Sequence, residues 1–143
     1  MFKKILVATD GSEGSKKAIH TTVKLVEGAS DAKVTLITVS QPIPISLYAD
    51  LQAVNIDPMA LSEQQAQEQL AEDAAPLEEA GIAYDTLAVV GDPGTEICRV
   101  AKEGDYDLVV VGSRGRNQFA EIVLGSVSNR VLHHAGCPVL VVR

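Results

Sequence analysis

The sequence predicts an α/β fold in which strands alternate with helices and form an open parallel sheet with helices on both faces. Short apolar runs rich in β-branched residues, such as Ile5–Ala8 and Leu108–Val111, alternate with segments of helical spacing along the chain. Runs of this composition are typical of strands that are buried on both faces. A helix between two such strands forms a right-handed crossover, and repeated crossovers give a parallel sheet.

Length and composition fit a single domain over residues 1–143. Of the 143 residues, 46% are hydrophobic and only 3% aromatic, so we expect a core of Val, Leu, Ile and Ala. The net charge of −7 argues against a nucleic-acid-binding protein, which would normally carry a basic face. No segment reaches the ~20 apolar residues of a membrane span. The two cysteines, Cys98 and Cys137, lack zinc-ligand spacing and indicate reduced thiols in a cytoplasmic protein.

The first part of the chain predicts a strand, a helix and a second strand. The first strand spans Lys3–Thr9 and is followed by an acidic turn. Ser12 is expected to cap the next helix, because a serine hydroxyl can accept a hydrogen bond from a free N–H at a helix start. Apolar residues recur at intervals of three and four up to Val26, and Gly28 can end this helix. The second strand is expected over Lys33–Val39.

The segment from Ser40 to Pro58 predicts a long loop, because it holds several prolines and no clean hydrophobic period. It is too apolar for a free linker, so we expect it to fold back onto the body. Two interpretations are open: a lid or binding surface, or a patch that covers the edge of the core. Its large apolar residues are Ile43, Ile45, Leu47, Tyr48, Leu51, Val54 and Ile56.

The rest of the chain predicts three helices and three strands. Pro76 should kink or tighten a long helix over Ala60–Ala80. Mixed polarity places the third strand at a sheet edge, and Asp92 with Pro93 marks the cap and first residue of the next helix. The remaining elements are strands at Ala83–Val90, Leu108–Val111 and Pro138–Val142, and helices from Pro93 to Gly104 and from Ser126 to His134.

The turn after the fourth strand carries a glycine pattern suited to binding an anion. Gly112 ends the strand, Gly115 follows three residues later, and Gly125–Ser126 opens a helix after nine intervening residues. Glycine lets backbone N–H groups approach a phosphate without a Cβ in the way, and a helix N-terminus adds unpaired N–H groups and a positive dipole end. The alternative is that these are ordinary turn and cap glycines.

Two charged residues beside these turns are further candidates. Asp10 could accept a hydrogen bond from a ribose hydroxyl or adenine, or reach Mg²⁺ through water; alternatively it forms a cap or an Asx turn. Arg114 could pair with a phosphate, or remain a solvated loop cation. The sequence has no P-loop, no G-x-G-x-x-G and no Ser/His/Asp signature. The site is therefore expected to hold its ligand rather than to turn it over.

The pattern G-x-x-G, nine residues, G-[S/T] resembles the nucleotide-binding signature of the universal stress protein family, in its ATP-binding branch. The opening KKILVATDGSEGS is similar to that family's first strand and acidic turn, and the closing AGCPVLVVR to its last strand. The resemblance covers Phe2 to Arg143. It implies an adenine-nucleotide α-hydrolase-like (Rossmann-like) fold with strand order 3-2-1-4-5. Ligands bind at the switch point of such sheets, so the turns after the first and fourth strands are expected to meet in one crevice.

The resemblance also implies the ligand and its contacts: ATP or another adenine nucleotide, with Mg²⁺ on the phosphates and no direct metal ligand from the protein. It assigns no catalytic residue. The family's nucleotide-binding positions fall on Ala8, Thr9 and Asp10 for the nucleoside, the backbone of Val39 for adenine, Val111, Gly112, Arg114 and Gly115 for ribose and phosphates, and Gly125, Ser126, Val127 and Ser128 for the phosphate tail.

The function implied by the resemblance is nucleotide-dependent regulation in a stress response, exerted on a protein partner by a homodimer. The dimer would form through Pro138–Val142, because pairing across a two-fold axis removes an exposed apolar edge strand; coverage by the chain's own helices is the alternative. A slow ATPase or phosphotransferase, and an interaction module that no longer binds nucleotide, also stay open. The missing general base counts against the former, and the intact glycine set against the latter.

Overall fold

The structure of the chain is a computed structural model and describes residues 2–113 and 124–143. Its centre is a five-stranded sheet with the order β3-β2-β1-β4-β5, and every neighbouring pair is parallel. The predicted strand order is therefore confirmed, as is the edge position of β3. The strands are β1 (Lys4–Ala8), β2 (Lys33–Ser40), β3 (Tyr84–Val90), β4 (Leu108–Gly112) and β5 (Val139–Val142).

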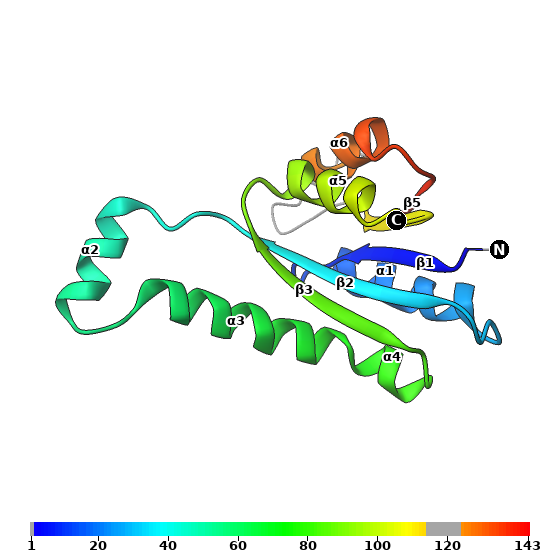
Figure 1. Cartoon of the computed structure of the whole chain (residues 1–143), viewed down its shortest axis with the longest axis horizontal. Helices are drawn as coiled ribbons and strands as arrows, with labels where there is room; N and C mark the ends of the chain where they lie inside the picture. Colours follow the sequence, from blue (N-terminus) through cyan, green and yellow to red (C-terminus); the bar gives the residue numbers. More distant parts are fainter. Residues whose placement is uncertain (1, 114–123) are drawn as a thin grey trace.

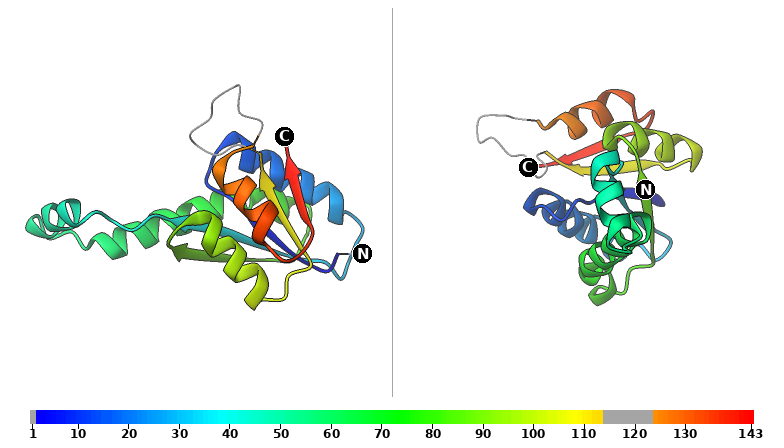
Figure 2. Two further views of the ribbon diagram at one scale, coloured as in Figure 1. Left: turned by 90° about the horizontal axis from the view of Figure 1, so that it is seen from above. Right: turned by 90° about the vertical axis from the view of Figure 1, so that its left-hand side faces the viewer.

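Helices cover both faces of the sheet, as the sequence predicts (Figures 1 and 2). One face packs against α1, α3 and α4, and the other against α5 and α6. No helix within the described ranges is long and apolar enough to cross a bilayer. The helices are α1 (Glu13–Val26), α2 (Ile45–Ala53), α3 (Pro58–Asp73), α4 (Ala75–Glu79), α5 (Pro93–Glu103) and α6 (Ser126–His134).

Alternation along β1 shows why the central strands are apolar throughout. Ile5 and Val7 point into the cluster beneath α1 and α3, whereas Leu6 points into the cluster beneath α5 and α6. All three side chains are fully buried. Successive residues of a strand face opposite sides, so a strand covered on both sides needs an apolar residue at every position.

Local capping signals in the sequence are confirmed. The hydroxyl of Ser12 accepts a hydrogen bond of 3.2 Å from the backbone N–H of Ser15 at the start of α1. Asp92 accepts one of 3.0 Å from the N–H of Thr95, and Pro93 is the first residue of α5. Both caps occupy free N–H groups of a helix end, which fixes where each helix begins after its strand.

The single helix predicted over Ala60–Ala80 is wrong in detail, because the structure has two helices there. Asp57 caps α3, so the helix begins at Pro58, and it ends at Asp73 before the short α4. Pro76 lies in the first turn of α4, where its missing N–H costs nothing. Within a continuous helix it would lose a hydrogen bond and clash with the preceding turn.

The predicted loop from Ser40 to Pro58 contains α2, and the expectation that it folds back onto the body is wrong. We call residues 41–62 the arm; α2 lies at its far end and contacts α3 (Figures 1 and 2). No residue of α2 is buried, and Ile45 is 89% exposed. Pro44 is extended at φ −58°, ψ 142°, and such prolines carry the chain away from the sheet before the helix starts.

Candidate functional site

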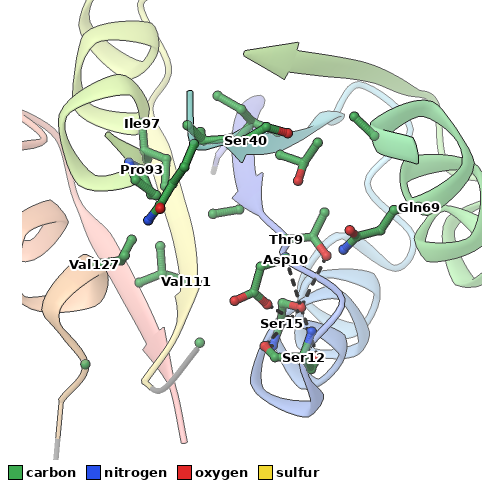
Figure 3. Close-up of a pocket in the computed structure, with 18 of the residues that line it drawn as sticks. Thr9, Asp10, Ser12, Ser15, Ser40, Gln69, Pro93, Ile97, Val111 and Val127 are labelled. Carbon is green, nitrogen blue, oxygen red and sulfur yellow. Dashed lines mark hydrogen bonds between the residues drawn. The ribbon is translucent and has the colours of Figure 1, made fainter. Parts of the chain in front are cut away.

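A cavity of about 630 Å³ lies at the carboxyl ends of β1, β2 and β4, where the strand order reverses. Open α/β sheets bind their ligands at this position, and the volume is within the range of small-molecule sites. Figure 3 shows residues from both halves of the sheet converging on it. The lining includes ten of the predicted site residues, namely Ala8, Thr9, Asp10, Val39, Val111, Gly112, Gly125, Ser126, Val127 and Ser128. Arg114 and Gly115 lie outside the described residues.

The turn after β1 forms the acidic side of the cavity. The backbone N–H of Thr9 donates to the carbonyl of Ile37 over 2.9 Å, which continues the sheet to the tip of the strand. Asp10 is half-buried, and its carboxylate accepts a hydrogen bond of 2.9 Å from the N–H of Ser12. The alternative of an Asx turn is therefore present in the structure, and the same side chain also lines the cavity (Figure 3).

The start of α6 forms the opposite side. Gly125 caps the helix without a side chain, and its N–H donates to the carbonyl of Ser113 over 2.6 Å. The hydroxyl of Ser128 lies within 3.0 Å of the carbonyls of Ser113 and Gly125, so it ties the helix start to the end of β4. Ser126 is exposed at the first helical position. A helix N-terminus of this kind presents N–H groups to an anion.

Gly112 is held close to the main chain of α1. A Cβ at this position would lie 2.7 Å from the carbonyl carbon and oxygen of Gly14. Real Cβ atoms do not approach backbone this closely, so the end of β4 and the start of α1 fit together only without that side chain. This packing is a structural reason for Gly112 in addition to the role expected from the glycine pattern.

An apolar wall joins the two polar sides. It combines the ends of β2 and β4 with α5 and the first turn of α6, through Val39, Ile97, Val111 and Val127. A flat, largely apolar group such as a purine base can pack against aliphatic side chains of this kind. The cavity therefore offers an apolar surface between an acidic turn and a cluster of backbone N–H groups.

Sequence reasoning missed two of the walls. The residues involved are Pro93 and Ile97 from α5, and Ser62, Gln65, Ala66 and Gln69 from α3. Gln65 and Gln69 lie in a stretch rich in Gln and Glu, a composition typical of a solvated helix face, and the packing of α3 against the sheet brings them to the cavity. The i, i+4 spacing of Gln65 and Gln69 places them on one face of α3 and is the signal that was available.

The pKa values of two side chains close to the cavity are shifted by their surroundings. Hydrogen bonds from the side chain and backbone of Thr95 lower the pKa of Asp92, and Arg130 acts in the same direction. Burial raises the pKa of the Cys98 thiol, which lies on the inner face of α5. Across residues 2–113 and 124–143, no group of three or more His, Cys, Asp or Glu side chains could hold a metal ion.

The sequence and the fold of this chain are similar to those of known proteins. The universal stress protein family matches residues 1–143. Universal stress protein Sll1388 of Synechocystis is 37% identical over 152 aligned residues, which cover 99% of this chain and 98% of that protein. The structure of MJ0577, a universal stress protein of Methanocaldococcus jannaschii, superposes with a TM-score of 0.84 at 29% identity, covering 99% of this chain and 96% of the other.

Two further solved structures contain adenine nucleotides. A universal stress protein in complex with cAMP is 28% identical, with a TM-score of 0.69, and 99% of this chain and 97% of the other are covered. At3g01520 of Arabidopsis thaliana, a universal stress protein family protein with AMP bound, is 26% identical with a TM-score of 0.71. The match covers 98% of this chain and 90% of the other.

Proposed function

Because the chain belongs to the universal stress protein family, we propose that it is an ATP-binding regulatory protein of the stress response. The observation that carries the proposal is the position of the cavity, which lies at the switch point with Asp10 on one side and the start of α6 on the other. A nucleotide needs an apolar surface for its base, acceptors for its ribose hydroxyls and N–H donors for its phosphates. The cavity offers all three.

The residues suggest one orientation for the nucleotide. Adenine would pack near Val39 and Ile97, and the ribose would lie beside Asp10. The phosphates would then point to the N-terminus of α6, where the N–H groups and the dipole favour negative charge. Arg114 and Gly115, which follow β4 in the sequence, would complete the phosphate end, and Mg²⁺ on the phosphates would be reached by Asp10 through water.

The proposed site binds its nucleotide for regulation and does not catalyse a reaction of it. The carboxylate of Asp10 already accepts a hydrogen bond from Ser12, and the hydroxyl of Ser128 lies against two carbonyls. Both groups thus hold the shape of the site. We assign no catalytic residue, and we propose that occupancy of the site alters the surface that a cytoplasmic protein partner recognises.

A homodimer through β5 is the proposed assembly. β5 is an edge strand of the sheet, and all its residues from Val139 to Val142 are half-buried. An edge strand presents unpaired N–H and C=O groups, and antiparallel pairing with a second copy across a two-fold axis satisfies them. The two nucleotide sites would then lie in one assembly.

Nucleotide binding is tested first by identifying what the protein carries. Purified protein is denatured, the released small molecules are identified by chromatography, and the refolded or nucleotide-stripped protein is titrated with ATP and AMP by calorimetry. We expect saturable binding of both, with ATP the tighter ligand because its longer phosphate chain reaches more N–H groups of α6. If neither nucleotide binds, the proposal is wrong.

A further inference from the structure

A buried acidic residue of α3 lies behind the cavity. Asp73 is the last residue of α3, and its carboxylate accepts a hydrogen bond of 2.6 Å from the hydroxyl of Thr9. The same oxygen lies 3.4 Å from the amide nitrogen of Gln69, one helical turn earlier. A buried carboxylate is costly unless donors surround it, so this arrangement fixes both partners.

Gln69 extends from Asp73 toward the acidic turn of the cavity. A Cβ at Gly11 would lie only 2.6 Å from the amide nitrogen of Gln69, so the carboxamide covers the backbone of this turn directly. Gly11 has a φ of +79°, a conformation that suits glycine. Figure 3 shows Gln69 reaching from α3 toward Thr9, next to Asp10.

The hydroxyl of Thr9 connects this pair to α1 as well. It lies 3.2 Å from the hydroxyl of Ser15, which in turn donates to the carbonyl of Ser12 over 3.0 Å. Thr9 and Ser15 are buried, so the three elements β1, α1 and α3 share one polar cluster beneath the turn that carries Asp10. Polar networks in a low-dielectric interior are rigid when their members are satisfied.

We propose that Gln69 and Asp73 are positioning residues for the nucleoside end of the site: from α3, they hold the turn Thr9–Asp10–Gly11 in the conformation that presents Asp10 to the ligand. The inference rests on the proposed function. The phosphate end is built from β4 and the start of α6, and these two elements are joined by contacts that involve no residue of α3. Loss of the α3 support therefore weakens contacts to ribose and base and leaves the phosphate contacts intact.

The chain contains a matched control on the same helix. Gln64 and Glu68 form another i, i+4 pair of a carboxamide and a carboxylate, at 3.1 Å, but both are exposed and neither lines the cavity. Substituting Gln64 or Gln69 by Leu removes the same group from the same helix. A difference between Gln64→Leu and Gln69→Leu therefore reports the position of Gln69 at the acidic turn and the cavity, and not helix propensity. Asp73, which does not line the cavity, separates support of the turn from direct contact with the ligand.

The test measures the affinity of each variant for adenosine, AMP and inorganic tripolyphosphate by calorimetry, together with its thermal unfolding. We expect Gln69→Leu and Asp73→Ala to lose about tenfold in affinity for adenosine and AMP, as for one hydrogen-bonded contact, and to keep their affinity for tripolyphosphate. Asp73→Asn should recover most of the loss, because its carbonyl oxygen can still accept from Thr9. Gln64→Leu should match the parent.

Three outcomes bear against these expectations in different ways. If Gln69→Leu binds adenosine as the parent does, or if the folded variants lose tripolyphosphate affinity equally, the positioning role is wrong while the proposed function stands. If the parent itself binds no adenine ligand, the proposed function fails and the inference with it. Should Asp73→Ala not fold, Gln69→Leu carries the test, since Gln69 is only half-buried.

Discussion

The hydroxyl of Thr9 donates a hydrogen bond of 2.6 Å to the carboxylate of Asp73, although 64 residues separate the two in the chain. Thr9 is 4% exposed and Asp73 6%, so water does not compete for this bond. Thr9 directly follows β1, and Asp73 ends α3. The bond therefore sets the position of α3 relative to the strand tips where the candidate site lies.

Replacing Thr9 by valine tests the energetic importance of this bond. The shape of the side chain is kept but its hydroxyl is lost, which leaves the buried carboxylate with one donor fewer. We expect the free energy of unfolding to fall by about 1–3 kcal/mol. Thr22→Val is the matched control, because the hydroxyl of buried Thr22 donates only to a carbonyl of its own helix, that of Ala18. Urea denaturation measures both, and equal losses would contradict the assignment.

Replacing Gly125 by valine should weaken ATP binding without unfolding the protein. Gly125 has φ −71° and ψ 166°, which any residue can adopt, so the backbone tolerates a side chain. A branched side chain at the cap would hold a phosphate away from the N–H groups of α6 and cost about 3 kcal/mol of binding free energy. Calorimetry with ATP measures this, and parental affinity in a folded variant would show that the phosphates bind elsewhere.

Dimerisation through β5 predicts the effect of a proline at one edge position. The N–H of Val109 in β4 donates to the carbonyl of Pro138, and the N–H of Ser113, just after β4, donates to that of Val142. Backbone groups alternate in direction along a strand, so those of Val141 point away from β4. Val141→Pro removes an outward N–H, spares the sheet and is expected to give a monomer by light scattering.

The opposite edge of the sheet supplies the control for this variant. The N–H of Gly91 donates to Ser40 of β2, so the backbone of Val90 in β3 points outward in the same way. Val90→Pro should leave the mass unchanged. A dimeric Val141→Pro, or a monomeric parent, would contradict the proposed interface.

Asp92 predicts a defined pH dependence for the cap of α5. Hydrogen bonds from Thr95 lower the pKa of Asp92 in the folded state below its ordinary value of 3.8, and Arg130 contributes. A lowered folded pKa stabilises the protein fully above the unfolded pKa, and this contribution disappears as the pH falls through the folded value. Asp92→Asn keeps the cap but does not titrate. Its stability relative to the parent should rise as the pH falls from neutral to about 3; a difference independent of pH would contradict this.

Elements with a strong local signal were predictable. β1 and β4 are apolar at every central position, and Ser12 and Asp92 have the side chains that cap helices, so these elements and starts are as expected. The strand order followed from the family resemblance, because hydrophobic periodicity does not specify which strands are neighbours. Most candidate site residues were predictable once the strand order was known. They lie at the ends of strands that meet at the switch point.

Features that depend on tertiary packing were not predictable. The apolar residues of the arm suggested burial, yet Val54 is 63% exposed, since composition does not specify a neighbour to pack against. Gln69 and Asp73 have the same spacing and chemistry as the exposed pair Gln64 and Glu68. Only the rotation of α3 against the sheet distinguishes a wall of the cavity from a solvated face.

The contact between Gly14 and Gly112 limits how this cleft can diversify. Gly112 at the end of β4 and Gly14 in α1 both lack a side chain, so the two segments meet there through main-chain atoms. Substitutions on α3, α5 and α6 change the side chains that line the cavity, but they do not alter this main-chain contact between β4 and α1. In this chain, side chains on these helices are therefore where a substitution can change ligand preference, while the contact between Gly14 and Gly112 keeps the end of β4 against α1.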